Sequence, residues 1–418
     1  MRNGERLRGL AGRWMECASQ PVMAERRRVW TAVNDLQQIR PALLVETCLM
    51  TDYVTEDELL CEDAYDRQIE KFLLENVRHA EEVGDDFVLE PRLRVPWAFS
   101  ASDFGMDIPV KHAVDAEGDS VATAFEHPIR APEDVERLKP RTFSVDRETT
   151  NRRVDALNAR FGDVLPVLPG GIDQVYGADG YSPWCGMHIT EITLNLFMLI
   201  GMNNIYFWLY DEPELFHRLM RFLTDDFLAY NRFLETEKLL TYNADNALTG
   251  GRYGYITEAK PEAEPAGNVA LKDLWLWCHA EETTTISPGM YKEFFLPYLS
   301  EAAALYGKTY FGCCENIDSR WELIRKGIPH LKGVSISPFS DLMRMGEYLG
   351  KDYVYSRKPH SAPLAQKAPD MDAARRDIAD TLNAAKGCNT EIVLRDVYRL
   401  HGRRQTLREW TDMVRSMI

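Results

Sequence analysis

The spacing of hydrophobic positions along the chain changes near residue 84. Before that point, hydrophobic residues recur at helical spacing, as in Glu25–Ile39. A second helical segment opens at Thr55 with acidic residues in its first turn and runs toward Gly84. We therefore predict an N-terminal helical extension over residues 1–84.

Beyond residue 84, short apolar runs alternate with helical patterns, as is typical of an α/β protein with a parallel sheet. Eight such runs follow one another and no Gly-rich or Pro-rich linker divides them, so we predict one (β/α)8 TIM barrel over residues 85–418. Two long insertions, about residues 95–160 and 172–238, interrupt the early part. The expected strands are Phe87–Leu93, Val164–Leu168, Leu239–Asn243, Leu271–Cys278, Lys308–Cys314, Gly333–Ser337, Asp352–Ser356 and Thr390–Leu394.

The composition is that of an ordinary soluble globular protein, with 45% hydrophobic and 27% charged residues. The formal net charge of −16 argues against nucleic acid or an anionic membrane surface as the main partner. The longest apolar run, Leu194–Tyr210, is broken by Gly201 and by asparagines, so we expect no membrane-spanning segment. The N-terminus lacks the apolar core of a signal peptide and the eight cysteines form no C-x-x-C pair, so we expect a reduced cytoplasmic enzyme.

Ionisable residues gather directly after several of the predicted strands. In a parallel barrel, side chains just past the carboxyl end of each strand point into a shared mouth, where active sites are built. A single Asp or His in such a loop more often caps a turn or is solvated, so the signal lies in the grouping. The groups are Asp103 with Asp107, Asp245 with Asn246, His279 with Glu281 and Glu282, Cys313 with Cys314 and Glu315, Arg357 with Lys358 and His360, and Arg395 with Asp396.

The pair Cys313-Cys314, followed by Glu315, is the most distinctive of these groups. Zinc takes sulfur, nitrogen and oxygen ligands, so a thiolate beside a carboxylate is a plausible half of a zinc site. Successive side chains of a strand point to opposite sides, so we expect only one of the two thiols to face the mouth. The alternative is a pair of buried, inert thiols.

Two further groups are candidates for binding a substrate. Arg357 and Lys358 are expected to hold an anionic ligand at the barrel mouth, although they also fit a surface pair. An aromatic loop with Tyr176, Tyr181 and Trp184 follows the second predicted strand. This loop is either a platform for a substrate or part of the hydrophobic packing.

Several segments of the C-terminal half carry a family resemblance. These segments are Thr285–Pro288, Tyr291–Tyr298, Gly312–Glu315, Ser335–Pro338 and Ser356–Pro359. Through them, over roughly residues 255–418, the chain resembles the uroporphyrinogen decarboxylase superfamily, which includes cobalamin-linked methyltransferases as well as the decarboxylase. The resemblance implies a (β/α)8 barrel, in which the zinc-dependent methyltransferase members use a His-x-Cys after one strand and a later cysteine.

The chain departs from the ligand set that this resemblance implies. Cys314 matches the family's cysteine, but Gly312 stands in the place of the histidine, and no cysteine follows the last strand. The resemblance therefore selects Cys314 as the thiol ligand and requires others to complete a zinc site. The candidate ligands are Glu282, Glu315, Asp396 and His279, and Glu282, Glu315 and Asp396 are also candidate catalytic groups.

The resemblance to the decarboxylase itself is looser. Its catalytic aspartate lies in an F-S-D sequence, which Phe99–Asp103 matches only in part, leaving Asp103 as a candidate substrate contact. The arginine-rich N-terminal motif that grips the tetra-acid substrate is missing. Authentic uroporphyrinogen decarboxylation is therefore not expected.

Three hypotheses about function remain open. The leading one is a zinc-dependent methyltransferase, in which the metal polarises a methoxy or thiol substrate. The chain has no D-x-H-x-x-G sequence, so a corrinoid would have to be supplied by a separate partner protein. The second hypothesis is a metal-independent decarboxylase or lyase that binds a small carboxylated substrate through Arg357 and Lys358. The third is a barrel that binds a small molecule without catalysis.

Overall fold

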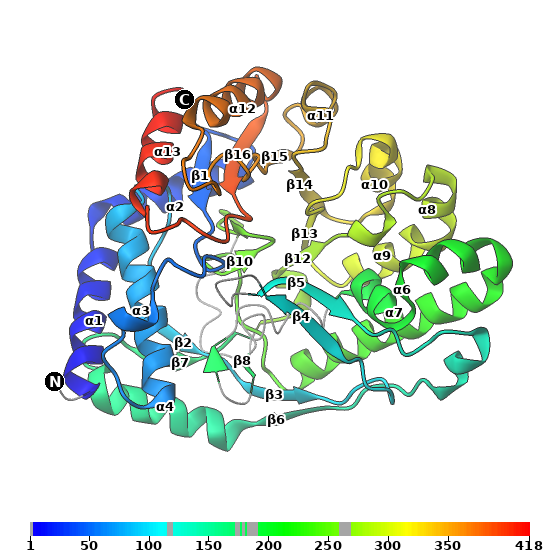
Figure 1. Cartoon of the computed structure of the whole chain (residues 1–418), viewed down its shortest axis with the longest axis horizontal. Helices are drawn as coiled ribbons and strands as arrows, with labels where there is room; N and C mark the ends of the chain where they lie inside the picture. The colour runs from blue at the N-terminus through cyan, green and yellow to red at the C-terminus, as the bar shows by residue number, and fades with distance from the viewer. Residues whose placement is uncertain (1–2, 115–119, 172–175, 178–179, 182–190, 259–268) are drawn as a thin grey trace.

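A central sheet of six parallel strands organises the chain, which the computed structural model describes over residues 3–114, 120–171, 176–177, 180–181, 191–258 and 269–418. Figure 1 shows these strands following one another through the middle of the molecule, with helices outside them. The predicted α/β class is confirmed. In spatial order the strands are β1 (Ala42–Val45), β16 (Asn389–Leu394), β15 (Val354–Arg357), β14 (Leu331–Ile336), β13 (Lys308–Phe311) and β12 (Trp275–Cys278).

The two faces of this sheet carry different side chains, because side chains alternate along each strand. Phe311, Val334 and Tyr355 point outward into a hydrophobic core shared with the surrounding helices. Tyr310 and Ser356 point to the inner side, where their hydroxyl oxygens lie 3.0 Å apart. The outer face is therefore apolar, while the inner face has room for polar groups.

Helices that follow the strands cover the outer face of the sheet (Figure 1). Ser287, Asp341 and Asp370 cap the first turns of three of them, each accepting a hydrogen bond from a backbone N–H three residues on. The helices are α8 (Pro288–Phe294), α9 (Leu296–Ala303), α10 (Trp321–Gly327), α11 (Leu342–Leu349), α12 (Met371–Ala384) and α13 (Gln405–Arg415), with short 3-10 turns at Leu271–Asp273, Glu281–Thr283 and Asp318–Arg320.

The expectation of a purely helical segment over residues 1–84 is wrong, because this segment supplies β1. That strand pairs in parallel with β16, with Leu44 opposite Val393. All four of its residues are buried, so its short apolar run has no alternation that would distinguish it from a buried helical turn. The helices of the segment are α1 (Asn3–Ala18), α2 (Pro21–Asn34) and α3 (Ala64–Glu82), with a 3-10 turn at Glu56–Glu58.

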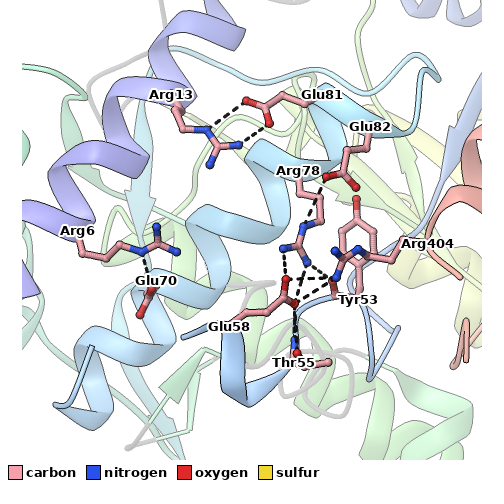
Figure 2. A network of polar contacts seen from close by, with 10 residues as sticks. All are labelled: Arg6, Arg13, Tyr53, Thr55, Glu58, Glu70, Arg78, Glu81, Glu82 and Arg404. Atoms are coloured by element: carbon pink, nitrogen blue, oxygen red, sulfur yellow. Dashed lines mark hydrogen bonds and ion pairs between the residues drawn. The ribbon is translucent and has the colours of Figure 1, made fainter. Parts of the chain in front are cut away.

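Charged side chains attach this N-terminal segment to the rest of the molecule, as Figure 2 shows. Arg6 on α1 donates to Glu70 on α3 at 2.7 Å. Glu58 accepts hydrogen bonds from Arg78 on α3 and from Arg404, which precedes α13. The first helices are thus connected both to each other and to the C-terminal part of the chain.

The early strands differ from the prediction. A parallel pair, β2 (Leu93–Val95) and β7 (Val167–Pro169), overlaps only the last residue of the first expected strand and the last two residues of the second. Residues 87–92 form no strand, because side chains bond their carbonyl groups instead. Arg26 donates to the carbonyl oxygen of Phe87, and the Trp14 indole donates to that of Glu90.

The third expected strand, Leu239–Asn243, is also absent for this reason. The side-chain amide of Asn243 donates to the carbonyl of Trp275 and accepts from its N–H, at 2.8 and 2.9 Å. The Gly171 N–H donates to the Thr241 hydroxyl. Side chains therefore replace a backbone ladder on both sides of this segment.

A tight hairpin reaches the inner side of the sheet. It consists of β10 (Leu248–Thr249) and β11 (Arg252–Tyr253), joined by a Gly250-Gly251 turn. Both glycines have positive φ, 63° and 79°, as a type I′ turn requires. A Cβ on Gly250 would lie 2.6 Å from the Tyr310 ring, so the turn packs directly on the inner face.

The remaining elements lie between β2 and β12. Helix α6 (Ile192–Asp211) is long and apolar enough to cross a membrane by composition alone, but 61% of its most apolar window is buried and it packs against α7, as in the core of a soluble protein. The other elements are the antiparallel pairs β3 (Ala98–Ala101) with β6 (Phe143–Asp146), β4 (Val110–Val114) with β5 (Ser120–Phe125) and β8 (Tyr176–Gly177) with β9 (Gly180–Tyr181), the helices α4 (Arg147–Phe161) and α7 (Pro213–Thr236), and a 3-10 turn at Pro132–Arg137.

Candidate functional site

Two thiols and a carboxylate meet where β12 and β13 end. One ligand atom each from Glu281, Cys313 and Cys314 lies within 4.8 Å of both others. Cys313 is buried, Glu281 is half-buried and Cys314 is exposed, so the cluster opens toward solvent on one side. Sulfur and carboxylate oxygen are both zinc ligands, so this cluster is the candidate metal centre.

The expectation that only one of the two thiols faces the mouth is wrong. It assumed that the strand continues to Cys314, whereas β13 ends at Phe311. Gly312 then adopts φ of +93°, which turns the chain out of the extended conformation. Because strand alternation no longer applies, the sulfur atoms of Cys313 and Cys314 lie 3.6 Å apart.

Glu315, a predicted ligand, holds the loops around this cluster. It is 2% exposed, and its two carboxylate oxygens accept hydrogen bonds from the N–H of Ala280, at 3.0 Å, and of Cys313, at 2.7 Å. Ala280 follows β12 and Cys313 follows β13. The carboxylate therefore joins the two loops that carry the cluster, and we assign it a positioning role.

His279 and Glu282, the other predicted ligands from the β12 loop, are oriented differently. His279 Nε2 lies 3.0 Å from Glu191 Oε1, and its Nδ1 faces Glu281 at 3.8 Å. Burial lowers the pKa of His279, but the negative charges of Glu191 and Glu281 outweigh it and raise the pKa to about 10. A ring protonated on both nitrogens has no lone pair for a metal. Burial also raises the pKa of Glu282, whose Oε2 has no hydrogen-bond partner in the described part of the chain.

Arg395 links the cluster to the other end of the sheet. Its Nη1 donates to Cys313 Sγ at 3.5 Å, and its Nε donates to Glu46 at 2.8 Å. Glu46 directly follows β1, so the sequence analysis missed it together with that strand. Asp396, the predicted catalytic residue beside it, has a positive φ of 60° and accepts from the Tyr398 hydroxyl at 3.5 Å.

The two neighbouring cations Arg357 and Lys358, at the end of β15 (Val354–Arg357), point to opposite faces of the sheet. Arg357 points outward and forms an ion pair of 2.6 Å with Asp377 on α12. The expectation that Arg357 lies at the barrel mouth with Cys314 is therefore wrong. Lys358 points inward, where its Nζ donates to Ser356 at 2.8 Å. Strand alternation separates them, and of these two cations only Arg357 has a carboxylate partner among the described residues.

The remaining predicted substrate residues are placed only in part. The Asp103 carboxylate accepts from the Gly105 N–H at 2.7 Å and is exposed, as in a turn-capping residue. Tyr176 and Tyr181 pair across β8 and β9. Trp184 lies outside the described residues.

The fold has a solved counterpart. A methyltransferase from Methanosarcina mazei is similar to this chain with a TM-score of 0.52 and 9% sequence identity, over 94% of this chain and 98% of that one. At this identity the likeness shows a common fold and nothing more. No protein-family model matches the sequence, and comparison with curated proteins gives no match.

Proposed function

We propose that this chain is a zinc-dependent methyltransferase that moves a methyl group between a small substrate and a corrinoid carried by a separate protein. The observation that carries the proposal is the cluster of Glu281, Cys313 and Cys314 at the strand ends. The methyltransferase fold of the structural neighbour supports it, as does the resemblance of the C-terminal segments to the uroporphyrinogen decarboxylase superfamily.

The residues of the cluster fit a zinc ion. Two thiolates on one tetrahedral zinc, each about 2.3 Å from the metal, are about 3.8 Å apart, and the sulfurs of Cys313 and Cys314 lie 3.6 Å apart. Three protein ligands leave a fourth position, as in catalytic rather than structural zinc sites. When bound, zinc would supply a Lewis acid that activates a thiol or methoxy group.

The protonation of the cluster also favours a cation there. Hydrogen bonding to Cys314 and burial raise the pKa of the Cys313 thiol well above its usual range, and burial raises the pKa of Glu281. A positive ion bound between these groups would offset the burial and the mutual repulsion that raise both pKa values. Metal binding should then release protons and strengthen with pH.

The chain's own residues hold the ligands in position. Glu315 fixes the Cys313 N–H, and the Ser335 hydroxyl donates to the Cys313 carbonyl at 2.8 Å. Arg395 donates to the Cys313 sulfur and so favours its thiolate form. Hydrogen bonds from neighbouring residues thus orient the metal ligand Cys313, as in known metal sites.

A closed barrel is the finer fold that we propose. Both edges of the six-stranded sheet have neighbours that would continue it. On the β1 side the Asp86 N–H donates to the Leu43 carbonyl at 2.7 Å, and on the β12 side the Asn243 amide bonds to Trp275. The parallel β2–β7 pair would then lie between these two edges and complete the ring.

The activity can be tested with free cobalamin in place of the partner. We expect zinc-loaded protein to demethylate methylcobalamin in the presence of small thiols, followed by the absorbance change of the corrinoid. The Cys314→Ala variant should lose this activity. Release of CO2 from small carboxylic acids without metal would instead favour a lyase, and binding without turnover would favour the non-catalytic alternative. We expect a reducing cytoplasmic compartment, because the site needs free thiols.

A further inference from the structure

We propose that Lys358 forms an anion-binding subsite on the inner face of the sheet, and that the substrate is a small carboxylic acid whose carboxylate binds there. The inference extends the proposed function by supplying the charge of the substrate. Carboxylate binding at Lys358 does not itself require the metal. An experiment can therefore contradict the zinc-dependent function without contradicting the subsite, and the reverse.

The ammonium group of Lys358 is buried, and no carboxylate of the described residues pairs with it. The residue is 5% exposed, and its Nζ makes one hydrogen bond, to the Ser356 hydroxyl at 2.8 Å. The Tyr310 ring lies beneath it, 5.4 Å from Nζ to the centroid. Within the described ranges no carboxylate forms an ion pair with it. An ammonium group has three donors, and buried lysines are almost always paired with an anion.

A neutral hydroxyl and an aromatic face offset only part of the cost of burying this charge. An acid on the adjacent strand, Glu391, stands opposite Ser356 in the register of β15 and β16. It is already bound by Arg252, at 2.6 Å from Nε to Oε1. A ligand carboxylate would therefore supply the counter-charge that the described protein groups do not.

The subsite lies on the same face as the thiols. The Cys313 carbonyl accepts from Ser335, and Ser335 stands opposite Ser356, the partner of Lys358, in the register of β14 and β15. Cys313 follows β13, so two strand spacings of about 4.8 Å each, about 10 Å in all, separate its strand from that of Lys358. A molecule the size of one aromatic ring or a short chain would span this distance.

Lys358 is expected to bind the carboxylate, whereas its neighbour in sequence, Arg357, is not. Arg357 has a comparable charge but is committed to Asp377 on the outer face. The choice between the two is set by strand alternation and not by residue type, which makes the pair an internal comparison.

The test is the binding of acetate and benzoate to metal-stripped protein, by calorimetry and by melting temperature against chloride at equal ionic strength. We expect carboxylates to raise the melting temperature of the wild type and to bind the Lys358→Met variant at least tenfold more weakly. Lys351→Met, which removes an exposed lysine after α11, is the matched control and should bind like wild type.

Without ligand, Lys358→Met should melt about 1–3 °C higher than wild type, because it removes an unpaired buried charge. A purely structural lysine would give a lower melting temperature. Equal carboxylate affinity in wild type and Lys358→Met would overturn the proposal. If that variant does not fold, a wild-type melting temperature that is indifferent to carboxylates would overturn it as well. If the wild type binds carboxylates but no zinc, the proposed zinc site is wrong and the proposed subsite at Lys358 is supported.

Discussion

The sulfur atoms of the adjacent residues Cys313 and Cys314 lie 3.6 Å apart, although neighbouring side chains in a strand diverge. The turn at Gly312, with its φ of +93°, makes this approach possible. A donor pair of this kind depends on the backbone as much as on the thiols, so the glycine can be tested as part of the site.

We expect Gly312→Ala to lose zinc as well as stability. A Cβ at this position would lie 3.2 Å from the Cβ of Ser335, in a conformation that costs a non-glycine residue about 1–2 kcal/mol. Gly387→Ala is the control, because Gly387 has a similar φ of +87° with nothing near its Cβ position. It should melt lower but keep its zinc, as measured by metal analysis of both variants. Full zinc content in Gly312→Ala would contradict the role of the turn.

Glu281 and Glu315 should respond differently to the same substitution. Glu281→Gln should lose zinc with little change in metal-free melting temperature, because it removes a ligand. Glu315→Gln should lower the free energy of unfolding by about 1–3 kcal/mol, because a buried acceptor of two N–H groups is weakened. Denaturant unfolding of the metal-free variants measures both stabilities, and metal analysis measures their zinc content. A larger loss of stability in Glu281→Gln than in Glu315→Gln would contradict the assignment of Glu281 as ligand and Glu315 as positioning residue.

Arg357 is expected to act on stability and not on binding. Breaking the partly buried ion pair between Arg357 and Asp377 by Arg357→Met should cost about 3 kcal/mol of unfolding free energy. Carboxylate affinity, measured by calorimetry on the folded fraction, should stay that of wild type. A variant that binds carboxylates weakly yet unfolds like wild type would place Arg357 in the site after all.

The strand ends that carry the site were predictable to within one residue where apolar β-branched residues mark the strands, as in Thr390–Leu394 and Gly333–Ser337. Which of the two cations Arg357 and Lys358 faces inward was not predictable. It depends only on which positions of the strand alternate toward the inner face. Glu46 was missed because four buried residues give β1 no period. Glu281 and Glu282 are equivalent in sequence, and only the course of the loop after β12 distinguishes them.

The first 84 residues should prove inseparable from the remainder, and Asp86 provides the test. Its buried carboxylate bonds Arg40, the Leu43 N–H and Arg415 of α13. We expect Asp86→Asn to cost about 3–5 kcal/mol, since it leaves two arginines without their partner. Asp163→Asn, at an exposed pair with Arg8, should change little. Equal unfolding curves for the two variants would contradict this attachment.

The same residue gives a pH dependence. Burial raises the pKa of Asp86, but Arg40 and Arg415 outweigh it, so the pKa is lowered. Its contribution to stability is therefore present above the unfolded value of about 3.9 and is lost as the pH falls through the lower folded value. Asp86→Asn should flatten the acid limb of the stability curve, measured by urea unfolding between pH 6 and pH 3. An unchanged acid limb would show that other carboxylates control it.

Zinc stoichiometry tests the central claim most directly. Protein purified with zinc and dialysed should be analysed as wild type and as the variants Cys313→Ala, Cys314→Ala, Glu281→Gln and Glu282→Gln. We expect about one zinc per chain in the wild type and in Glu282→Gln, and loss of metal in the other three. No bound zinc in the wild type, or full retention in Cys313→Ala and Glu281→Gln, would contradict the metal centre and the methyltransferase function built on it.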